Sequence, residues 1–476
     1  MIGARGLVPA MRRLGKWART DTTRRDVTLL VFVAIVVASA DVLWRGIEMR
    51  PPHWDMARHL LTSLQYRDLL DSGEWLGFLT NYYYYPPLLY WLTQPLYAAL
   101  GTDVQVAVMT NCAFLVVLVL SVYGIGVELH DRRSARLAAI FALALPFVVS
   151  QFKEYQVDAP LTAMVALALW ALIRTREFSS VRASYVFGIV AGLGLLTKWT
   201  FVVVMAAPLA YALLVAVRAR RVRPLRPVLG ALAIALVIAG PWYASNLLHL
   251  GRDLLANAYA AGAREGDPAL VSFESLIWYP TRLVQEHLYV VPTLLFLGGL
   301  LRWNRRNLYP LLLVVGPLAG FTLLENKDAR YIMPAMVGIA VIATSWLPRR
   351  RWIGPALLAY AAVAFEAISF GNPLLPAEVD VGPIIAFAQH GYIIGAPTHE
   401  DWHLEAAVAQ VAARWPGGTV SYTGLDTIWC NPWDVRYYAA KYGLTYVDSN
   451  ADATVTRGDK GVVLPDGTRL AIVPRP

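Results

Sequence analysis

Apolar residues occur in long runs along the first 370 residues of the chain, and short polar segments separate them. Runs such as VTLLVFVAIVVASADVLW and VAVMTNCAFLVVLVLSVYGIGV are long enough to cross the hydrocarbon core of a bilayer as helices. This pattern predicts an α-helical polytopic membrane protein with about eleven spans. We expect the spans near 27–44, 104–127, 135–150, 157–173, 183–197, 200–217, 227–245, 287–301, 308–323, 331–347 and 352–369.

The composition agrees with a membrane protein. Hydrophobic residues make up 57% of the 476 positions and charged residues only 16%, whereas a soluble chain carries about a quarter charged residues. The first apolar run is not followed by a small-residue cleavage site, so we expect a retained anchor rather than a removed signal peptide. The two cysteines, Cys112 and Cys430, cannot build a disulfide framework.

The distribution of positive charge predicts the orientation. More than half of the 42 Lys and Arg residues lie in six alternate connections, which read MRRLGKWARTDTTRR, HDRRSAR, RTREFSSVR, RARRVRPLR, RWNRRN and PRRR. Lys and Arg close to span ends mark the cytoplasmic side. The basic segment 1–26 is therefore expected inside, and the C-terminus outside. The net charge of +9 follows this membrane pattern, so we expect no nucleic-acid partner.

One apolar segment does not fit the alternation. If PPLLYWLTQPLYAALG crossed the membrane, every later basic connection would move to the outer side. We therefore interpret 86–99 as a helix that lies in the membrane interface, where Tyr and Trp are favoured. The first outer loop then spans 45–103, within a transmembrane domain of residues 27–370.

The character of the sequence changes from residue 371. HLEAAVAQVAARW has the period of an amphipathic helix, and GTVSYTG, LTYVD and GVVLPDGTRLAIVP are typical of short strands with turns. We predict that 371–476 forms a small extracytoplasmic α/β domain. The fourth outer loop, 246–287, is long for a simple connection and is interpreted either as a lid or as a plain surface loop.

Ionisable residues gather at the outer ends of the predicted spans. A charge at a membrane boundary costs free energy unless it is paired or hydrated, so each one is a candidate functional residue. The alternative is that each side chain reaches the interface or pairs with a neighbour without further function. The residues concerned are Asp55, Lys153, Glu154, Asp158, Lys198, Lys327, Asp328 and Arg330.

Three blocks in this region resemble a known family. They read NYYYYPPLLYWLTQPLYAALG, LHDRRSARLAAIFALALPFVVSQFKEYQVDAPLTAMVALALWAL and GIVAGLGLLTKWTFVVV. Two later segments, PWYASNLLHLG and KDARYIMP, show a weaker similarity. In order and spacing they are similar to the dolichyl-phosphate-mannose protein mannosyltransferases. These enzymes are GT-C glycosyltransferases, and they include the bacterial aminoarabinose transferases of lipid A. The resemblance covers residues 50–217.

The resemblance implies an enzyme of a bacterial cytoplasmic (inner) membrane. Such enzymes take a sugar from a polyprenyl-phosphate carrier and pass it to a lipid, polysaccharide or protein acceptor at the outer face, usually with inversion. It implies that Asp55 is the general base, and that Asp158 positions the acceptor or helps to bind a metal. Capping of the following helix is the alternative role for Asp158. We expect Trp54 to shield Asp55, so that the pKa of the carboxyl rises.

The donor phosphate needs cations, and the sugar needs polar and aromatic contacts. Lys198, Arg330 and Lys153 are the candidates for the phosphate, because a guanidinium can donate to two phosphate oxygens at once and an ammonium is a strong point charge. For the sugar or acceptor we predict contacts from His53, His59, Tyr84, Tyr85 and Trp199. An aromatic belt at the interface would also account for the tyrosines.

Two positions depart from the family pattern. Many relatives have a Glu directly after the first-loop acid and a Lys before the double proline, whereas this chain has Met56 and Tyr85. The first difference favours a metal-independent or differently liganded site, and two histidines six residues apart are a weak metal signal. We therefore predict no metal ligands and no certain cofactor, and a divalent metal stays open. The second difference makes aminoarabinose a doubtful donor sugar.

Two other functions are compatible with many spans and outer acids. A transporter or lipid flippase would show inverted repeats and charged residues near the middle of the bilayer. Here the ionisable residues lie at outer span ends and the loops are asymmetric, which favours an interfacial enzyme. A catalytically inactive scaffold is supported only by the missing Glu and Lys.

Overall fold

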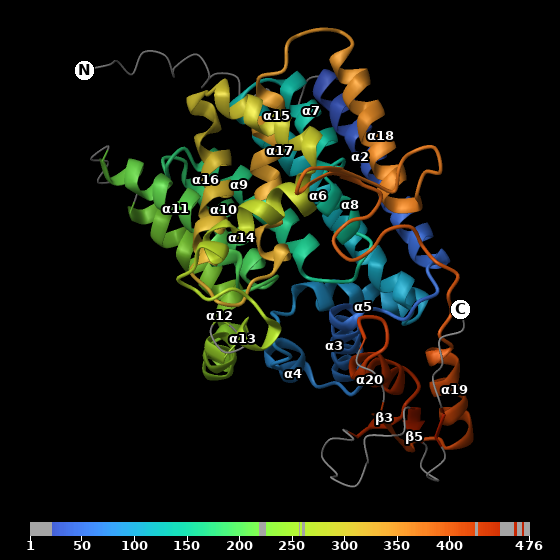
Figure 1. Cartoon of the computed structure of the whole chain (residues 1–476). Helices are drawn as coiled ribbons and strands as arrows, with labels where there is room; N and C mark the ends of the chain where they lie inside the picture. The colour runs from blue at the N-terminus through green and yellow to red at the C-terminus, as the bar shows by residue number, and fades with distance from the viewer. Residues whose placement is uncertain are drawn as a thin grey trace, which may run out of the picture.

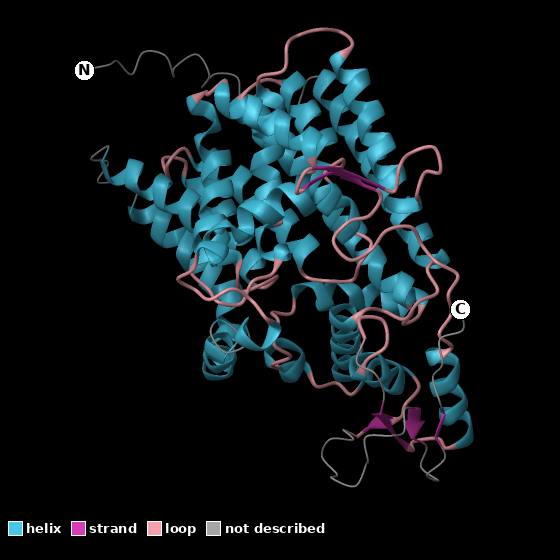
Figure 2. Ribbon diagram, viewed as in Figure 1, coloured by secondary structure: helices cyan, strands magenta, loops and turns pink. Residues whose placement is uncertain are grey.

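A computed structural model gives the fold of the chain (Figure 1). It describes residues 21–218, 225–256, 258, 262–423, 427–447, 461–463 and 469–470. A bundle of helices forms most of the molecule, and a small layer of strands and two helices lies at one end (Figure 2).

The long apolar runs form the bundle helices, as the sequence predicts. Six helices are long and apolar enough to cross a membrane: α2 (Asp21–Ile47), α6 (Val104–Leu129), α9 (Asp158–Thr175), α11 (Phe201–Arg218), α12 (Leu225–Leu255) and α18 (Ile353–Phe370). The segment of α14 (Phe273–Arg282) and η4 (Leu283–Leu288) is followed, after a sharp bend, by α15 (Val290–Leu301). If this bent pair is counted as one span, the number of candidate spans rises to seven.

The remaining predicted spans are helices of fewer than 18 residues, which is short for a membrane span. They are α7 (Arg132–Ala142), α8 (Pro146–Gln151), α10 (Val181–Leu195), α16 (Leu308–Thr322) and α17 (Ala335–Ser345). The expected span 135–150 is broken between α7 and α8, because Pro146 lacks an amide hydrogen and disfavours a helical conformation in the residue before it. By length and composition alone, the described helices therefore supply six or seven spans rather than eleven.

Small residues allow the bundle helices to approach closely. A Cβ added to Gly188 of α10 would lie 2.5 Å from the carbonyl oxygen of Ala231 in α12, and one on Gly126 of α6 would lie 2.6 Å from the Cα of Ala135 in α7. Close backbone approach through small residues is typical of membrane helix pairs. Larger side chains at these two glycines would push the helices apart.

The segment predicted as the first outer loop is largely helical. It contains α3 (Trp54–Asp71), α4 (Trp75–Thr80) and α5 (Leu88–Leu100). Helix α5 coincides with the helix expected at 86–99. The expectation that Asp55 lies in a loop is wrong, because the structure places Asp55 in the first turn of α3. A helix holds its side chain in a more defined direction than a loop would.

Most of the expected fourth outer loop is also helical. Helix α12 continues to Leu255, and α13 (Gly262–Glu265), α14 and η4 follow. The part between α12 and α13 lies largely outside the described residues. The Asp267 carboxylate accepts a hydrogen bond of 2.8 Å from the backbone N–H of Lys327, which ties the segment to the chain just before the turn η6 (Ala329–Ile332).

The C-terminal region begins with a hairpin of β1 (Glu378–Val381) and β2 (Ile384–Ala388), which contacts η4 and α15. Beyond it lie α19 (Leu404–Arg414), β3 (Thr419–Thr423), α20 (Pro432–Lys441), β4 (Thr445–Tyr446), β5 (Gly461–Val463) and β6 (Arg469–Leu470). The strands form a sheet of order β4-β3-β5-β6, in which β3 is parallel to β4 and antiparallel to β5. The predicted amphipathic helix is present, and each predicted strand segment contains a strand, although 464–468 and 471–474 of the last segment lie outside the described residues.

Helix α20 was not predicted, and it joins the C-terminal region to the bundle. Asn431 and Asp434 form a reciprocal capping box at its start, with Pro432 in the first turn. The helix packs on α3, as Figure 1 shows. The backbone N–H of Trp54 also donates to the carbonyl of Ile428 at 3.2 Å. The start of α3 is thus held from two directions.

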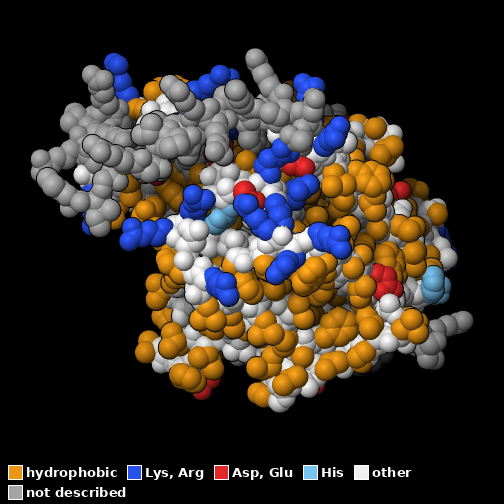
Figure 3. Space-filling view, turned by 90° about the horizontal axis from the view of Figure 1, so that it is seen from above, with side chains coloured by type: hydrophobic (Ala, Val, Ile, Leu, Met, Phe, Trp, Pro, Cys, Tyr) orange, Lys and Arg blue, Asp and Glu red, His pale blue; other side chains and the backbone are white. Residues whose placement is uncertain are grey.

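The two ends of the bundle differ in charge. Lys and Arg side chains gather on the end seen from above in Figure 3, where α7 begins and where the basic segments 302–306 and 349–351 lie. The sheet with α19 and α20 lies at the opposite end (Figure 1). The basic connections thus share one end of the bundle, and the assignment of that end to the cytoplasm stays a prediction.

We predict that Gln410→Cys, on an exposed position of α19, reacts with a membrane-impermeant thiol reagent in intact cells. Arg133→Cys, in the HDRRSAR connection, should react only after the membrane is opened, because Lys and Arg near span ends remain in the cytoplasm. Both variants would be made in a chain with Cys112 and Cys430 replaced by Ser. Labelling of Arg133→Cys but not Gln410→Cys in intact cells would invert the topology.

Candidate functional site

An ion pair joins the first turn of α3 to the turn η6. The Asp55 carboxylate lies 2.5 Å from a guanidinium nitrogen of Arg330, although 275 residues separate the two in the sequence. The Asp55 side chain is about one-third exposed and that of Arg330 about one-sixth, with values of 35% and 16%. The pair is therefore partly accessible to solvent.

Arg330 is held by more than Asp55. Its Nε donates to both carboxylate oxygens of Asp328, at 3.0 and 2.9 Å, and its Nη2 pairs with the same group. Its Nη1 also donates to the side-chain oxygen of Gln156 at 2.8 Å. Because these bonds use the planar fork of the guanidinium, its orientation toward Asp55 is fixed.

A chain of hydrogen bonds continues from Gln156 into the protein. The Gln156 amide nitrogen donates to the Glu154 carboxylate at 2.6 Å, and Glu154 lies 2.7 Å from Nε2 of His53. His53 directly precedes α3, and the ring of Trp429 meets it edge-on at 5.9 Å. The buried His53 thus links the start of α3 to the 153–158 segment.

Asp158 and Lys198 form a second ion pair, and both are buried. The Lys198 ammonium lies 2.7 Å from Asp158, which is in the first turn of α9. The ammonium also lies 5.6 Å from the centre of the Tyr85 ring and 5.3 Å from that of Tyr331. Removing one partner of such a pair would leave an uncompensated buried charge, which is strongly destabilising.

Aromatic side chains line the space beside the two ion pairs. The rings of His59 and Tyr85 lie 5.0 Å apart, and Nδ1 of His59 is 2.7 Å from the Tyr90 hydroxyl. Burial lowers the pKa of His59 to about 3, so the imidazole is neutral at physiological pH. The ring of Tyr84 meets that of Tyr85 edge-on, with centres 4.6 Å apart. The predicted residues Tyr84, Tyr85 and His59 therefore lie close to Asp55.

The electrostatics of Asp55 differ from the expectation. Burial of the carboxyl raises its pKa, but the charge and hydrogen bond of Arg330, together with His59 and His53, outweigh burial, so that the pKa lies well below its usual value. Trp54 is an exposed side chain and does not shield the carboxyl. The expected rise in the pKa of Asp55 was wrong because the sequence did not show the pairing with Arg330.

The structure does not bring every predicted residue to this place. Lys153 is fully buried between the rings of Trp44 and Phe365, each centred 5.7 Å from its ammonium, and it makes no hydrogen bond to any described residue. Trp199 is partly buried beside Trp242 in a smaller apolar cluster. Among the described residues, no group of three or more His, Cys, Asp or Glu side chains is arranged to hold a metal ion.

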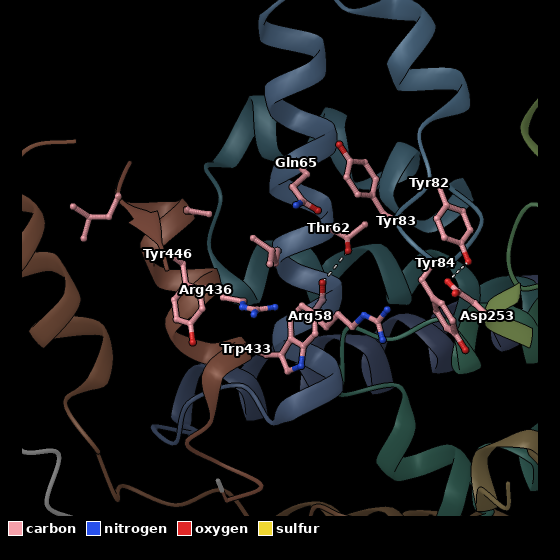
Figure 4. A pocket seen from close by; sticks show the side chains of 13 residues that line it. Arg58, Thr62, Gln65, Tyr82, Tyr83, Tyr84, Asp253, Trp433, Arg436 and Tyr446 are labelled. Carbon is pink, nitrogen blue, oxygen red and sulfur yellow. Dashed lines mark hydrogen bonds between the residues drawn. The ribbon is translucent and has the colours of Figure 1, made fainter. Parts of the chain in front are cut away.

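A cavity of about 650 Å³ opens next to this ionic cluster. Its walls come from α3, from the tyrosine segment 82–84, from the end of α12 and from α20 (Figure 4). Arg58 lines it and lies one helical turn after Asp55 on α3. Sequence reasoning assigned no role to Arg58, Trp433 or Arg436, although the spacing of Asp55 and Arg58 on one helix face would have indicated the first.

Comparisons with known proteins agree with this architecture. The family model of dolichyl-phosphate-mannose-protein mannosyltransferases matches residues 85–244, a range that includes Asp158 and Lys198. The lipopolysaccharide core galacturonosyltransferase RgtB of Rhizobium johnstonii is 28% identical over 236 residues. That match covers 48% of this chain and 44% of RgtB, so the chain spans less than half the length of this curated relative.

A solved structure shows the same fold. The crystal structure of ArnT from Cupriavidus metallidurans, bound to undecaprenyl phosphate, superposes with a TM-score of 0.53 at 18% sequence identity, over 87% of this chain and 75% of that one. The family match, the curated relative and the shared fold agree with the resemblance to the GT-C glycosyltransferases.

Proposed function

We propose that the chain transfers a sugar from a polyprenyl-phosphate carrier to an acceptor hydroxyl at the outer face of a bacterial cytoplasmic membrane, with inversion at the anomeric carbon. The observation that carries the proposal is the arrangement of the Asp55–Arg330 and Asp158–Lys198 pairs beside an open cavity. Carboxylates and cations close together supply the charges that a base and an anionic leaving group require.

The donor phosphate would bind at Arg330 and Lys198. Nucleotide sugars remain in the cytoplasm, so a transferase that acts outside needs a donor activated by a group that crosses on a lipid. The crystal structure of ArnT, a protein of the same fold, contains bound undecaprenyl phosphate, which supports a carrier of this kind. Lys153 lies apart from both cations and is no longer a favoured partner of the phosphate.

Asp55 would act as the general base. The acceptor oxygen forms a bond to the anomeric carbon, its proton passes to Asp55, and the bond to the phosphate oxygen breaks with its electron pair. With Arg330 bound to it, Asp55 is ionised but weakly basic. When the donor phosphate shares Arg330, less positive charge remains for Asp55 and its pKa rises. The base is then strongest when the donor is in place.

Asp55→Asn should lower turnover at least about a hundredfold, since general-base catalysis contributes roughly 10²–10⁴-fold. The amide keeps the size of the side chain but cannot accept the proton, and donor binding should persist through the phosphate and lipid contacts. Asp158→Asn breaks the buried pair with Lys198 and should lower stability, but in the folded fraction it should cost less turnover than Asp55→Asn or act through the apparent affinity of the acceptor. The measurement is release of free polyprenyl phosphate from a labelled donor by purified protein.

Normal turnover by well-folded Asp55→Asn would remove Asp55 from the catalytic role. A wild-type protein that releases no polyprenyl phosphate from any donor, but moves the intact lipid across vesicles, would instead establish a flippase.

The Arg330→Gln variant should move the acid limb of the kcat/KM profile to higher pH. Arg330 lowers the pKa of Asp55 and burial raises it, so loss of the guanidinium leaves burial dominant. Since a base must be ionised, wild-type protein should show no acid limb from Asp55 above about pH 4. Arg330→Lys keeps the charge but not the planar fork, so its acid limb should lie at lower pH than that of Arg330→Gln. An acid limb at the same pH in wild type and Arg330→Gln would contradict this account.

A further inference from the structure

The cavity beside Asp55 is lined mainly by cationic and aromatic side chains. Two arginines and several aromatic rings face it, together with a single carboxylate, Asp253, at the far side. Figure 4 shows that Arg58 of α3 and Arg436 of α20 approach it from different elements. The bundle and the C-terminal region therefore form this cavity together.

Trp433 lies between the two guanidinium groups. Its ring centre is 5.2 Å from Arg58 and 4.7 Å from Arg436. Arg58 also lies 4.6 Å from the Tyr84 ring, and Arg436 lies 4.8 Å from that of Tyr446. Stacking on rings holds both planar guanidinium groups in place, and each guanidinium carries several N–H donors that can bind oxygen atoms.

The charge of the cavity is positive near α3. Across the described ranges, no carboxylate forms an ion pair with Arg58. Asp253 accepts a hydrogen bond of 2.7 Å from the Tyr82 hydroxyl, which ties it to the tyrosine segment. An anionic group that entered the cavity would therefore gain its strongest contacts at Arg58 and Arg436, close to Trp433.

The position of the cavity indicates which substrate it receives. Lys198 and Arg330, the proposed partners of the donor phosphate, do not line it. Arg58, Thr62 and Gln65 of the lining follow Asp55 along one face of α3, so the cavity leads away from the proposed base. The volume of about 650 Å³ is in the usual range for sites that hold a small molecule.

We propose that this cavity binds an anionic sugar unit of the acceptor, with a carboxylate or phosphate between Arg58 and Arg436 and the sugar ring against Trp433 and the tyrosines. This inference rests on the proposed function, because it assigns the acceptor to the side of Asp55 opposite the donor cations. It makes the C-terminal region part of the acceptor site rather than a separate module.

The test is binding of digalacturonic acid to the purified full-length protein, measured by titration calorimetry without donor. Its carboxyl-reduced form, digalactose, is the neutral control, and galactose 6-phosphate distinguishes a phosphate from a carboxylate. We expect digalacturonic acid, galactose 6-phosphate or both to bind at least about tenfold tighter than the neutral sugar. Arg58→Gln and Arg436→Gln should each remove most of that difference, and added salt should weaken it.

Arg67→Gln is the matched control, since Arg67 lies on the same helix but pairs with Asp71 outside the cavity. Equal affinities of wild-type protein for all three sugars would overturn the inference, whichever variants fold. An equal loss in Arg67→Gln and Arg58→Gln would also overturn it. Because no donor is present, the binding result does not depend on turnover. If the protein releases polyprenyl phosphate but shows no preference for anionic sugars, this inference alone is refuted. If it binds anionic sugars but releases no polyprenyl phosphate, the proposed function alone is refuted.

Discussion

The fork of Arg330 between Asp328 and Asp55 is the interaction on which the rest of the site depends. Charges that leave water must be paired and hydrogen-bonded, and Arg330 meets this requirement by joining three segments that are remote in sequence. Through Gln156 and Glu154 the same network reaches His53 at the start of α3. Loss of this one guanidinium would therefore release both the first turn of α3 and the carboxylate that it carries.

The pairing of Asp55 with Arg330 also gives a physical reason for the donor to bind before the base acts in the proposed reaction. A carboxylate bound to Arg330 is ionised but a weak base, and a donor phosphate that competes for the guanidinium would strengthen it. The base therefore reaches its full strength only after the donor has bound. Helix α20 packs on α3 from the other side, so the acceptor cavity and the base are built on the same helix.

The sequence predicted the helices with long apolar runs because burial in a bilayer requires them, but it did not predict α3 or α20. Helix α3 mixes charged and apolar residues without a clear period, and its packing between α5 and α20 stabilises it. Asp55, Asp158, Lys198 and Arg330 were all recognised singly as charged residues at outer span ends. Their pairing was not, since tertiary folding brings Asp55 to Arg330 across 275 positions, and the pKa expectation failed with it.

The most direct test of this account is a cryo-electron microscopy structure of the protein with undecaprenyl phosphate bound. The account predicts that the phosphate oxygens lie within hydrogen-bonding distance of Arg330 or Lys198, on the side that faces the Asp55 carboxylate. A phosphate held beside Lys153, or anywhere that leaves the Asp55–Arg330 and Asp158–Lys198 pairs untouched, would contradict it.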